Sequence, residues 1–248
     1  MNRNEFLEAL PLSRITCKLT GATLEICTDD IDDIHVMVSG ADGDVKSLRI
    51  AVNGNQLLLE QPAVSMQKNP VDTSWLQITL RLPRTWKGRI DARTVTGWIT
   101  ARELNGSDVT LDSVSGQIST EELLAGNATL RTVTGDIRAA GLVCTKASIS
   151  TTSGDVSLTR ARLYHASLGS ITGGMSLSLD DAFQSITATS VLGSLAIEAP
   201  IGECSVQHRN VAGHIRSVGV CITEEAEASV HFNTVSGSLS LVNNLPLA

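Results

Sequence analysis

The sequence predicts an all-β protein: a single-stranded parallel β-helix, or solenoid, of about eight coils of 19–20 residues with an N-terminal β cap. Three observations predict this fold. A six-residue pattern centred on glycine recurs eight times, and apolar and polar residues alternate around each glycine. Proline, which cannot donate to a strand ladder, occurs between Arg84 and Leu245 only at Pro200. A near-constant period of this length is typical of a solenoid in which each repeat forms one coil.

Each repeat places a Ser/Thr-rich step before the glycine and an apolar residue two positions after it, as in Thr132-Val133-Thr134-Gly135-Asp136-Ile137. Successive glycines are separated by 19, 19, 19, 19, 20, 20 and 24 residues. Because a side chain does not fit at a tight corner, glycines in register predict one corner running along the solenoid. The glycines are Gly97, Gly116, Gly135, Gly154, Gly173, Gly193, Gly213 and Gly237.

Two or three short strands are expected in each coil, and two of them are marked by the pattern. One passes through the glycine, with apolar residues two before and two after it, such as Val133 and Ile137. The other carries inward residues seven and five positions before the next glycine, such as Ala128 and Leu130. We expect both sets to face the core and the coils to stack in sequence order, about 4.8 Å apart.

Residues 1–86 lack the repeat and are expected to form a capping section, followed by the β-helix section over residues 87–248. An uncapped end would leave unpaired strand edges, so a cap is needed before the first coil. A short helix is predicted within residues 1–10 and a loop over residues 62–74. Strands are predicted over residues 14–19, 22–27, 34–39, 48–52, 56–60 and 76–82.

Composition restricts the function. A net charge of −7 and 3% aromatic residues argue against nucleic-acid binding, which needs basic faces and stacking platforms. The sequence has no apolar run long enough to span a membrane and no signal peptide, and its five scattered cysteines suggest reduced thiols. These features predict a cytoplasmic protein, with a cell-surface or envelope-associated location as the alternative.

The repeated Thr-Val-Thr-Gly-Asp-Ile motif, preceded by Leu80-Arg81-Leu82-Pro83, resembles the bacterial putative-adhesin domain family of unknown function. The resemblance covers roughly residues 14–243. It implies a right-handed β-helix and a place among envelope-associated or envelope-stress proteins of bacteria. It supplies no catalytic residues.

Two rows of hydroxyl side chains beside the glycines are the predicted binding face, which could meet a glycan or could simply bond along the strand ladder. The rows consist of Thr94, Thr96, Ser113, Ser115, Thr132, Thr134, Thr151, Ser153, Ser170 and Thr172. A carbohydrate-active enzyme is the alternative, because Asp136 and Asp155 occupy one position in adjacent coils. Both could equally be solvated residues of an exposed turn.

The remaining motifs indicate neither a cofactor nor a metal site. The acidic stretch around Asp30 lacks the glycine spacing of a calcium loop, and His208 replaces an inward apolar residue, where a satisfied core histidine is expected. The sequence therefore predicts a non-enzymatic scaffold or binding module, with a protein or a cell-envelope glycan as partner. Self-association through the coil ends, at residues 239–247, is a further expectation.

Overall fold

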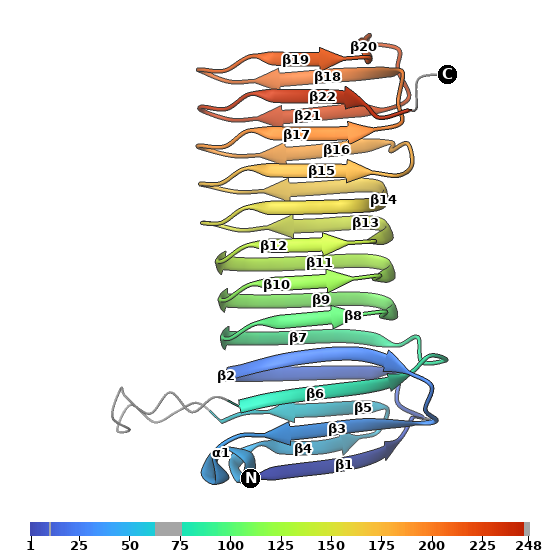
Figure 1. Ribbon diagram of the computed structural model, residues 1–248, viewed down its shortest axis with the longest axis vertical. Coiled ribbons are helices and arrows are strands. Elements are labelled where there is room, and N and C mark those ends of the chain that lie inside the picture. Colours follow the sequence, from blue (N-terminus) through green and yellow to red (C-terminus); the bar gives the residue numbers. More distant parts are fainter. Residues whose placement is uncertain (10, 63–75, 246–248) are drawn as a thin grey trace.

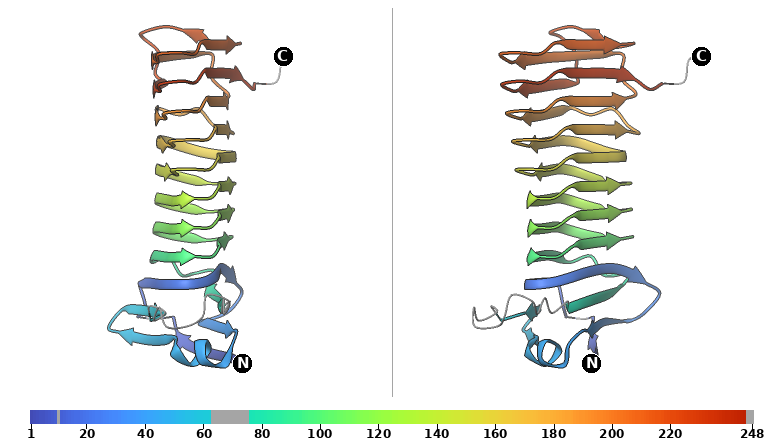
Figure 2. Two further views of the ribbon diagram at one scale, coloured as in Figure 1. Left: turned by 90° about the vertical axis from the view of Figure 1, so that its left-hand side faces the viewer. Right: turned by 60° about the vertical axis from the view of Figure 1, so that its left-hand side comes forward.

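The computed structural model describes residues 1–9, 11–62 and 76–245. These residues form an elongated all-β body in which two sheets face each other across a narrow core (Figures 1 and 2). Each repeat supplies one strand to each sheet, and strands of successive repeats are parallel and in register. The predicted all-β, solenoid-like fold is confirmed.

The strands of each sheet stack along the long axis of the molecule, from the N-terminal end upward in Figure 1. Sheet A contains, in spatial order, β1 (Asn2–Glu8), β3 (Asp33–Ser39), β6 (Leu76–Pro83), β2 (Arg14–Asp29), β8 (Ile99–Arg102), β10 (Ile118–Glu121), β12 (Ile137–Ala140), β14 (Val156–Gly169), β15 (Met175–Leu179), β17 (Leu195–Ala199), β22 (Leu239–Asn243) and β19 (Ile215–Val218).

Sheet B lies opposite and shares the long strands β2 and β14 with sheet A. Its strands are, in spatial order, β4 (Arg49–Asn53), β5 (Gln56–Glu60), β2, β7 (Arg89–Thr96), β9 (Asn105–Ser115), β11 (Leu124–Thr134), β13 (Val143–Ser150), β14, β16 (Ser185–Thr189), β21 (Ser229–Asn233) and β18 (Glu203–Arg209). The short strand β20 (Cys221–Ile222) pairs with the start of β18, and α1 (Asp42–Ser47) lies near the N-terminus.

The core is built from the inward side of both sheets. In every repeat except the outermost one, the residues seven and five positions before the glycine, such as Ala128 and Leu130, are buried as predicted, and so are the residues two after it, such as Ile137. In the outermost repeat Val206 is half-buried and Ile215 is 43% exposed. The residues two before it are not buried: Val133 is 44% exposed. The prediction was wrong there because the strand of sheet B already ends its inward series one residue earlier, at Thr132.

The N-terminal end differs from the prediction in two ways. Residues 1–9 contain a strand, β1, and not a helix, since they pair antiparallel with β3 and alternate between exposed and half-buried positions. Phe6 and Leu7 therefore lie on opposite faces, where a helix would place them on one side. The two strands predicted over residues 14–27 are one strand, β2, while α1 was not predicted. The predicted loop lies, apart from residue 62, outside the described residues.

Both ends of the stack depart from sequence order. Strand β2 lies between β5 and β7 in sheet B and between β6 and β8 in sheet A. At the C-terminal end, β21 lies between β16 and β18 in sheet B, and β22 lies between β17 and β19 in sheet A (Figure 1). The last repeat in the sequence is therefore inserted before the repeat of β18 and β19. The prediction of sequential stacking was wrong here, because repeats of similar length and register can pair with either neighbour. Residues 239–243 are therefore inside the stack and not at its end.

The five cysteines are free thiols. Burial raises the pKa of Cys17 to about 12, with a smaller contribution from the Asp91 charge, and burial raises the pKa of Cys144 to about 12. These thiols are protonated at neutral pH and poorly reactive. Within the described part of the chain, no helix is both long and apolar enough to cross a membrane.

Candidate functional site

The first of the two predicted hydroxyl rows faces the core, and the prediction of an outward row was wrong for it. Its members, which are Thr94, Ser113, Thr132, Thr151 and Ser170, are 3–6% exposed. They continue the inward series of each sheet B strand. Three of the hydroxyls reach the glycine of the preceding coil: Ser113 Oγ donates to the Gly97 carbonyl at 3.4 Å, Thr132 Oγ1 to the Gly116 carbonyl at 3.0 Å, and Thr151 Oγ1 to the Gly135 carbonyl at 3.1 Å. The row holds the corners together.

The second hydroxyl row is exposed at the corner. Some of its hydroxyls also bond along the stack, as Thr134 Oγ1 does with the Val114 carbonyl at 3.3 Å. The row consists of Thr96, Ser115, Thr134, Ser153 and Thr172. One exposed row on a tight corner offers less contact area than the two-row face that the sequence predicted.

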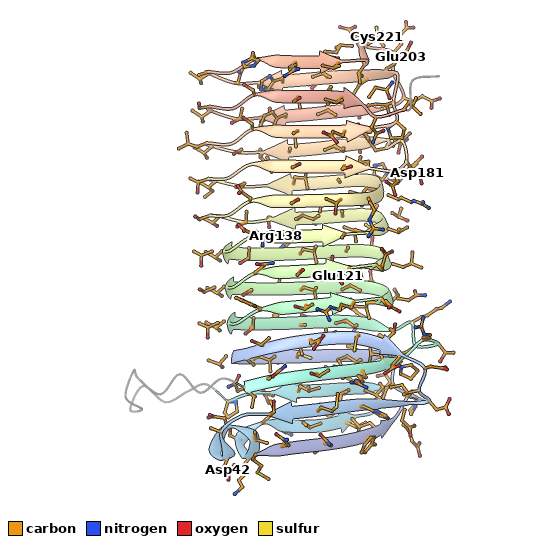
Figure 3. All side chains as sticks on the ribbon, viewed as in Figure 1. Asp42, Glu121, Arg138, Asp181, Glu203 and Cys221 are labelled. Carbon is orange, nitrogen blue, oxygen red and sulfur yellow. The ribbon has the colours of Figure 1, made fainter. Side chains whose placement is uncertain are left out.

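The predicted carboxylate pair lies at the same corner, on adjacent coils. Asp136 Oδ1 accepts the backbone N–H of Asp155 at 3.0 Å, and Asp155 Oδ1 accepts that of Gly174 at 2.8 Å. Arg138, labelled on the face of sheet A in Figure 3, donates to Asp136 Oδ2 at 2.7 Å. These contacts give the aspartates a structural role in linking one coil to the next.

His208 lies in the outermost repeat at the C-terminal end and stacks on Phe232, with ring centroids 5.2 Å apart. Burial lowers its pKa, and its Nε2 atom is buried without a hydrogen-bond partner. The expectation of a satisfied core histidine was wrong in this respect. No group of three or more His, Cys, Asp or Glu residues that could hold a metal ion occurs in the described ranges.

A shallow groove on the outer face of sheet B is the strongest candidate site. Its volume is about 450 Å³, and it crosses β11, β13, β14 and β16. Its floor is a row of small hydroxyl side chains that are paired in register from strand to strand. These are Thr129, Ser148, Ser167 and Thr187.

A second row forms one wall of the groove. Asn127, Lys146, His165 and Ser185 follow one another on the same four strands. His165 Nδ1 lies 2.7 Å from Ser185 Oγ, and both side chains are thereby oriented. Lys146 makes no salt bridge within the described residues, so its ammonium group is free for a ligand.

The side chains that line the groove differ in charge from those that line three other surface pockets. The pockets near Glu60, Asp181 and Glu227 each include a carboxylate. The sheet B groove includes none, although the chain carries a net charge of −7. Its hydroxyls can donate and accept hydrogen bonds, and Lys146 adds a positive charge. The groove therefore suits a hydroxyl-rich ligand that is neutral or anionic.

The sequence prediction missed this groove, although a signal for it was present. The floor residues lie six positions before each glycine, between the two inward residues at seven and five. Strand alternation places such positions outward. In the middle repeats they are Thr129, Ser148, Ser167 and Thr187, whereas the first repeat has Asp91 there. A search of every outward position, and not only those beside the glycine, would have found the row.

Comparison with known proteins supports the fold assignment. The model of the family described as Toastrack DUF4097 matches residues 12–242. No curated protein is similar enough in sequence to match the chain.

Solved structures resemble the chain over almost its whole length. A putative adhesin from Bacteroides fragilis superposes with a TM-score of 0.64 at 14% identity, covering 97% of each chain. A putative adhesin from Parabacteroides distasonis gives 0.61 at 12% identity, again covering 97% of each chain. A putative lipid binding protein from the same organism gives 0.56 at 13% identity, covering 97% of this chain and 96% of the other. At these identities the likeness shows the fold alone.

Proposed function

Because the chain belongs to the Toastrack DUF4097 family, we propose that it is a non-enzymatic binding scaffold whose sheet B groove holds a cell-envelope glycan. The observation that carries the proposal is the row of four hydroxyls on the groove floor, which is free of carboxylates and flanked by Lys146. Sugar hydroxyls need partners that both donate and accept, and Ser and Thr side chains do both.

The rigidity of the solenoid supports this function. The floor residues are held at fixed spacing by parallel pairing with both neighbouring strands. A site that is already ordered loses little conformational entropy when it binds an extended polymer. The two structural neighbours described as putative adhesins support a role in binding other molecules. A glycan partner of this kind places the protein in the cell envelope.

The test is binding of the purified protein to an array of neutral and acidic bacterial oligosaccharides. Ser167→Trp fills the groove floor at an exposed position and is expected to lower binding at least tenfold. The matched control is Ser176→Trp, which adds the same side chain to an exposed position on the opposite sheet. Lys146→Ala is expected to weaken the binding of acidic sugars more than the binding of neutral sugars. Absence of binding by the unmodified protein, or equal binding by both tryptophan variants, would overturn the proposal.

A further inference from the structure

The exposed corner carries an uninterrupted row of β-branched side chains, which we call the corner ridge. These residues lie two positions before each glycine, and seven of the eight are apolar. In stacking order they are Val95, Val114, Val133, Thr152, Ile171, Val191, Val235 and Val211. The apolar members are 42–85% exposed. The turns that carry the ridge lie along the left-hand edge of the molecule in Figure 1.

The ridge is rigid because its backbone is bonded from coil to coil. The Thr152 N–H donates to the Val133 carbonyl at 3.2 Å, and the Ile171 N–H to the Thr152 carbonyl at 3.3 Å. Similar bonds link Val191 to Ile171 through its neighbour Leu192, and Val211 to Val235. The side chains therefore recur at the strand spacing of about 4.8 Å. Identical ladders at this spacing can interdigitate and exclude water, as in a steric zipper.

The exposed area of the ridge is large enough for an interface. Together with the exposed Leu192, the apolar ridge side chains leave roughly 600 Å² accessible, at the upper end of the patches found on monomers. Two such ridges in contact bury on the order of 1,200 Å², which is the lower limit for a stable protein–protein interface.

We propose that the corner ridge is a homodimer interface, in which two copies lie side by side and parallel about a two-fold axis along the solenoid. Each ridge residue then meets the same residue of the second copy, as an isologous interface requires. This inference is independent of the proposed glycan site, which lies on the flat face of sheet B.

The charges beside the ridge favour the parallel arrangement. Four positions before the glycine, the sheet B flank carries Arg93 and Arg131 in two repeats and Asp112 in the repeat between them; one position after the glycine, the sheet A flank carries Trp98 and Asp136 in the first and third repeats. Arg93 also contacts Asp91 within its own chain, at 2.9 Å. A two-fold axis along the solenoid brings the sheet B flank of one copy against the sheet A flank of the other at the same level. Arg131, which makes no salt bridge among the described residues, then faces Asp136 of the second copy.

The same axis brings Arg93 against the indole of Trp98 of the second copy, which is 62% exposed in the single chain. In an antiparallel pair, the first repeat of one copy would instead lie opposite the outermost repeat of the other. Arg93 would then face Arg209 of the second copy, and these like charges repel. The flanks thus select one of the two possible arrangements.

The test is the mass of the protein in solution by light scattering and sedimentation equilibrium. The unmodified chain is expected at twice its mass of 26.2 kDa. The double variant Val133→Lys/Val191→Lys is expected at the single-chain mass, because four lysines would meet across the axis. The matched control Leu124→Lys/Tyr164→Lys changes equally exposed residues at the opposite corner and is expected to remain a dimer. Circular dichroism checks that each variant is folded.

Cross-linking tests the geometry separately. In a Cys221→Ser background, which removes the exposed native thiol, Val133→Cys is expected to form a disulfide-linked dimer on mild oxidation, and Leu124→Cys is not. A single-chain mass for the unmodified protein, a dimer that survives the double lysine change, or cross-linking through Leu124→Cys alone would overturn the proposal. A monomer that sediments with phosphatidylglycerol vesicles, and loses this on Val133→Lys, would assign the ridge to a lipid surface instead.

Discussion

The buried hydroxyl row contains both hydrogen-bonded hydroxyls and hydroxyls without a partner. We predict that removing a hydroxyl of the first kind lowers the free energy of unfolding, whereas removing one of the second kind does not. Thr151 Oγ1 donates to the Gly135 carbonyl at 3.1 Å, at a corner where the next coil packs directly above. Among the described residues, no backbone N–H outside the strand ladders donates to this oxygen. Replacing the hydroxyl by a methyl group in Thr151→Val therefore leaves a part-buried acceptor without this donor.

The loss of such a partner costs about 1–3 kcal/mol. For a chain of this size that corresponds to a decrease of roughly 2–12 °C in the melting temperature. Ser170, one coil further, is the comparison, since its Oγ is buried with no hydrogen-bond partner. Ser170→Ala removes an unsatisfied group and is expected to leave stability unchanged or slightly higher.

Urea unfolding followed by far-UV circular dichroism measures both changes as shifts in the midpoint at constant slope. The reasoning is refuted if Thr151→Val unfolds at the same midpoint as the unmodified chain. It is also refuted if Ser170→Ala destabilises by as much as Thr151→Val, because the hydroxyls would then act through packing and not through hydrogen bonding.

Two further predictions concern a corner glycine and the half-buried His208. Gly154→Ala is expected to destabilise by about 2–6 kcal/mol, because φ is +151° and an added Cβ would lie 2.1 Å from the Gly135 carbonyl oxygen. Gly202→Ala, where a Cβ meets nothing within 4 Å, should change stability by less than about 0.5 kcal/mol in the same urea titration. Burial lowers the pKa of His208 in the folded chain, so the unfolded chain binds the proton more readily as the pH falls below the ordinary value of 6.5. The free energy of unfolding therefore decreases as the pH falls below 6.5, and we expect a smaller decrease in His208→Leu. An identical pH dependence of the melting temperature in both proteins would contradict this.

Local sequence pattern predicted the strand before each glycine and its inward residues, but the expectation of a strand through the glycine was wrong, since Gly135 lies between β11 and β12. The alternation of apolar and polar residues follows from the geometry of a single strand, so Ala128 and Leu130 could be assigned to the core without knowledge of any partner. The glycine corners were also predictable, because a Cβ at Gly135 would meet the backbone of the coil below. Which residues point inward just before the glycine was not predictable. Thr132 is buried and Val133 exposed, which reverses what their hydrophobicity suggests.

The reversal has a physical cause that residue type alone does not reveal. At the corners of Gly116 and Gly135, the glycine carbonyl accepts a hydrogen bond from the inward threonine of the next coil. The exposed valine is then left for contacts outside the chain. The predicted binding face consisted of the hydroxyls nearest the glycine, whereas the groove floor lies three to five residues earlier, on the flat part of sheet B.

The sequence by itself determined the solenoid, its period, its corner and most of its core, because these depend on interactions repeated identically in every coil. Only the tertiary structure decided the order of the coils at both ends and the strand at residues 2–8. These depend on which of several equivalent edges a segment pairs with. Neighbouring repeats offer nearly the same register and the same apolar pattern. Which edge a strand pairs with therefore depends on connections and end contacts that differ from one repeat to the next. A local sequence pattern does not contain this information.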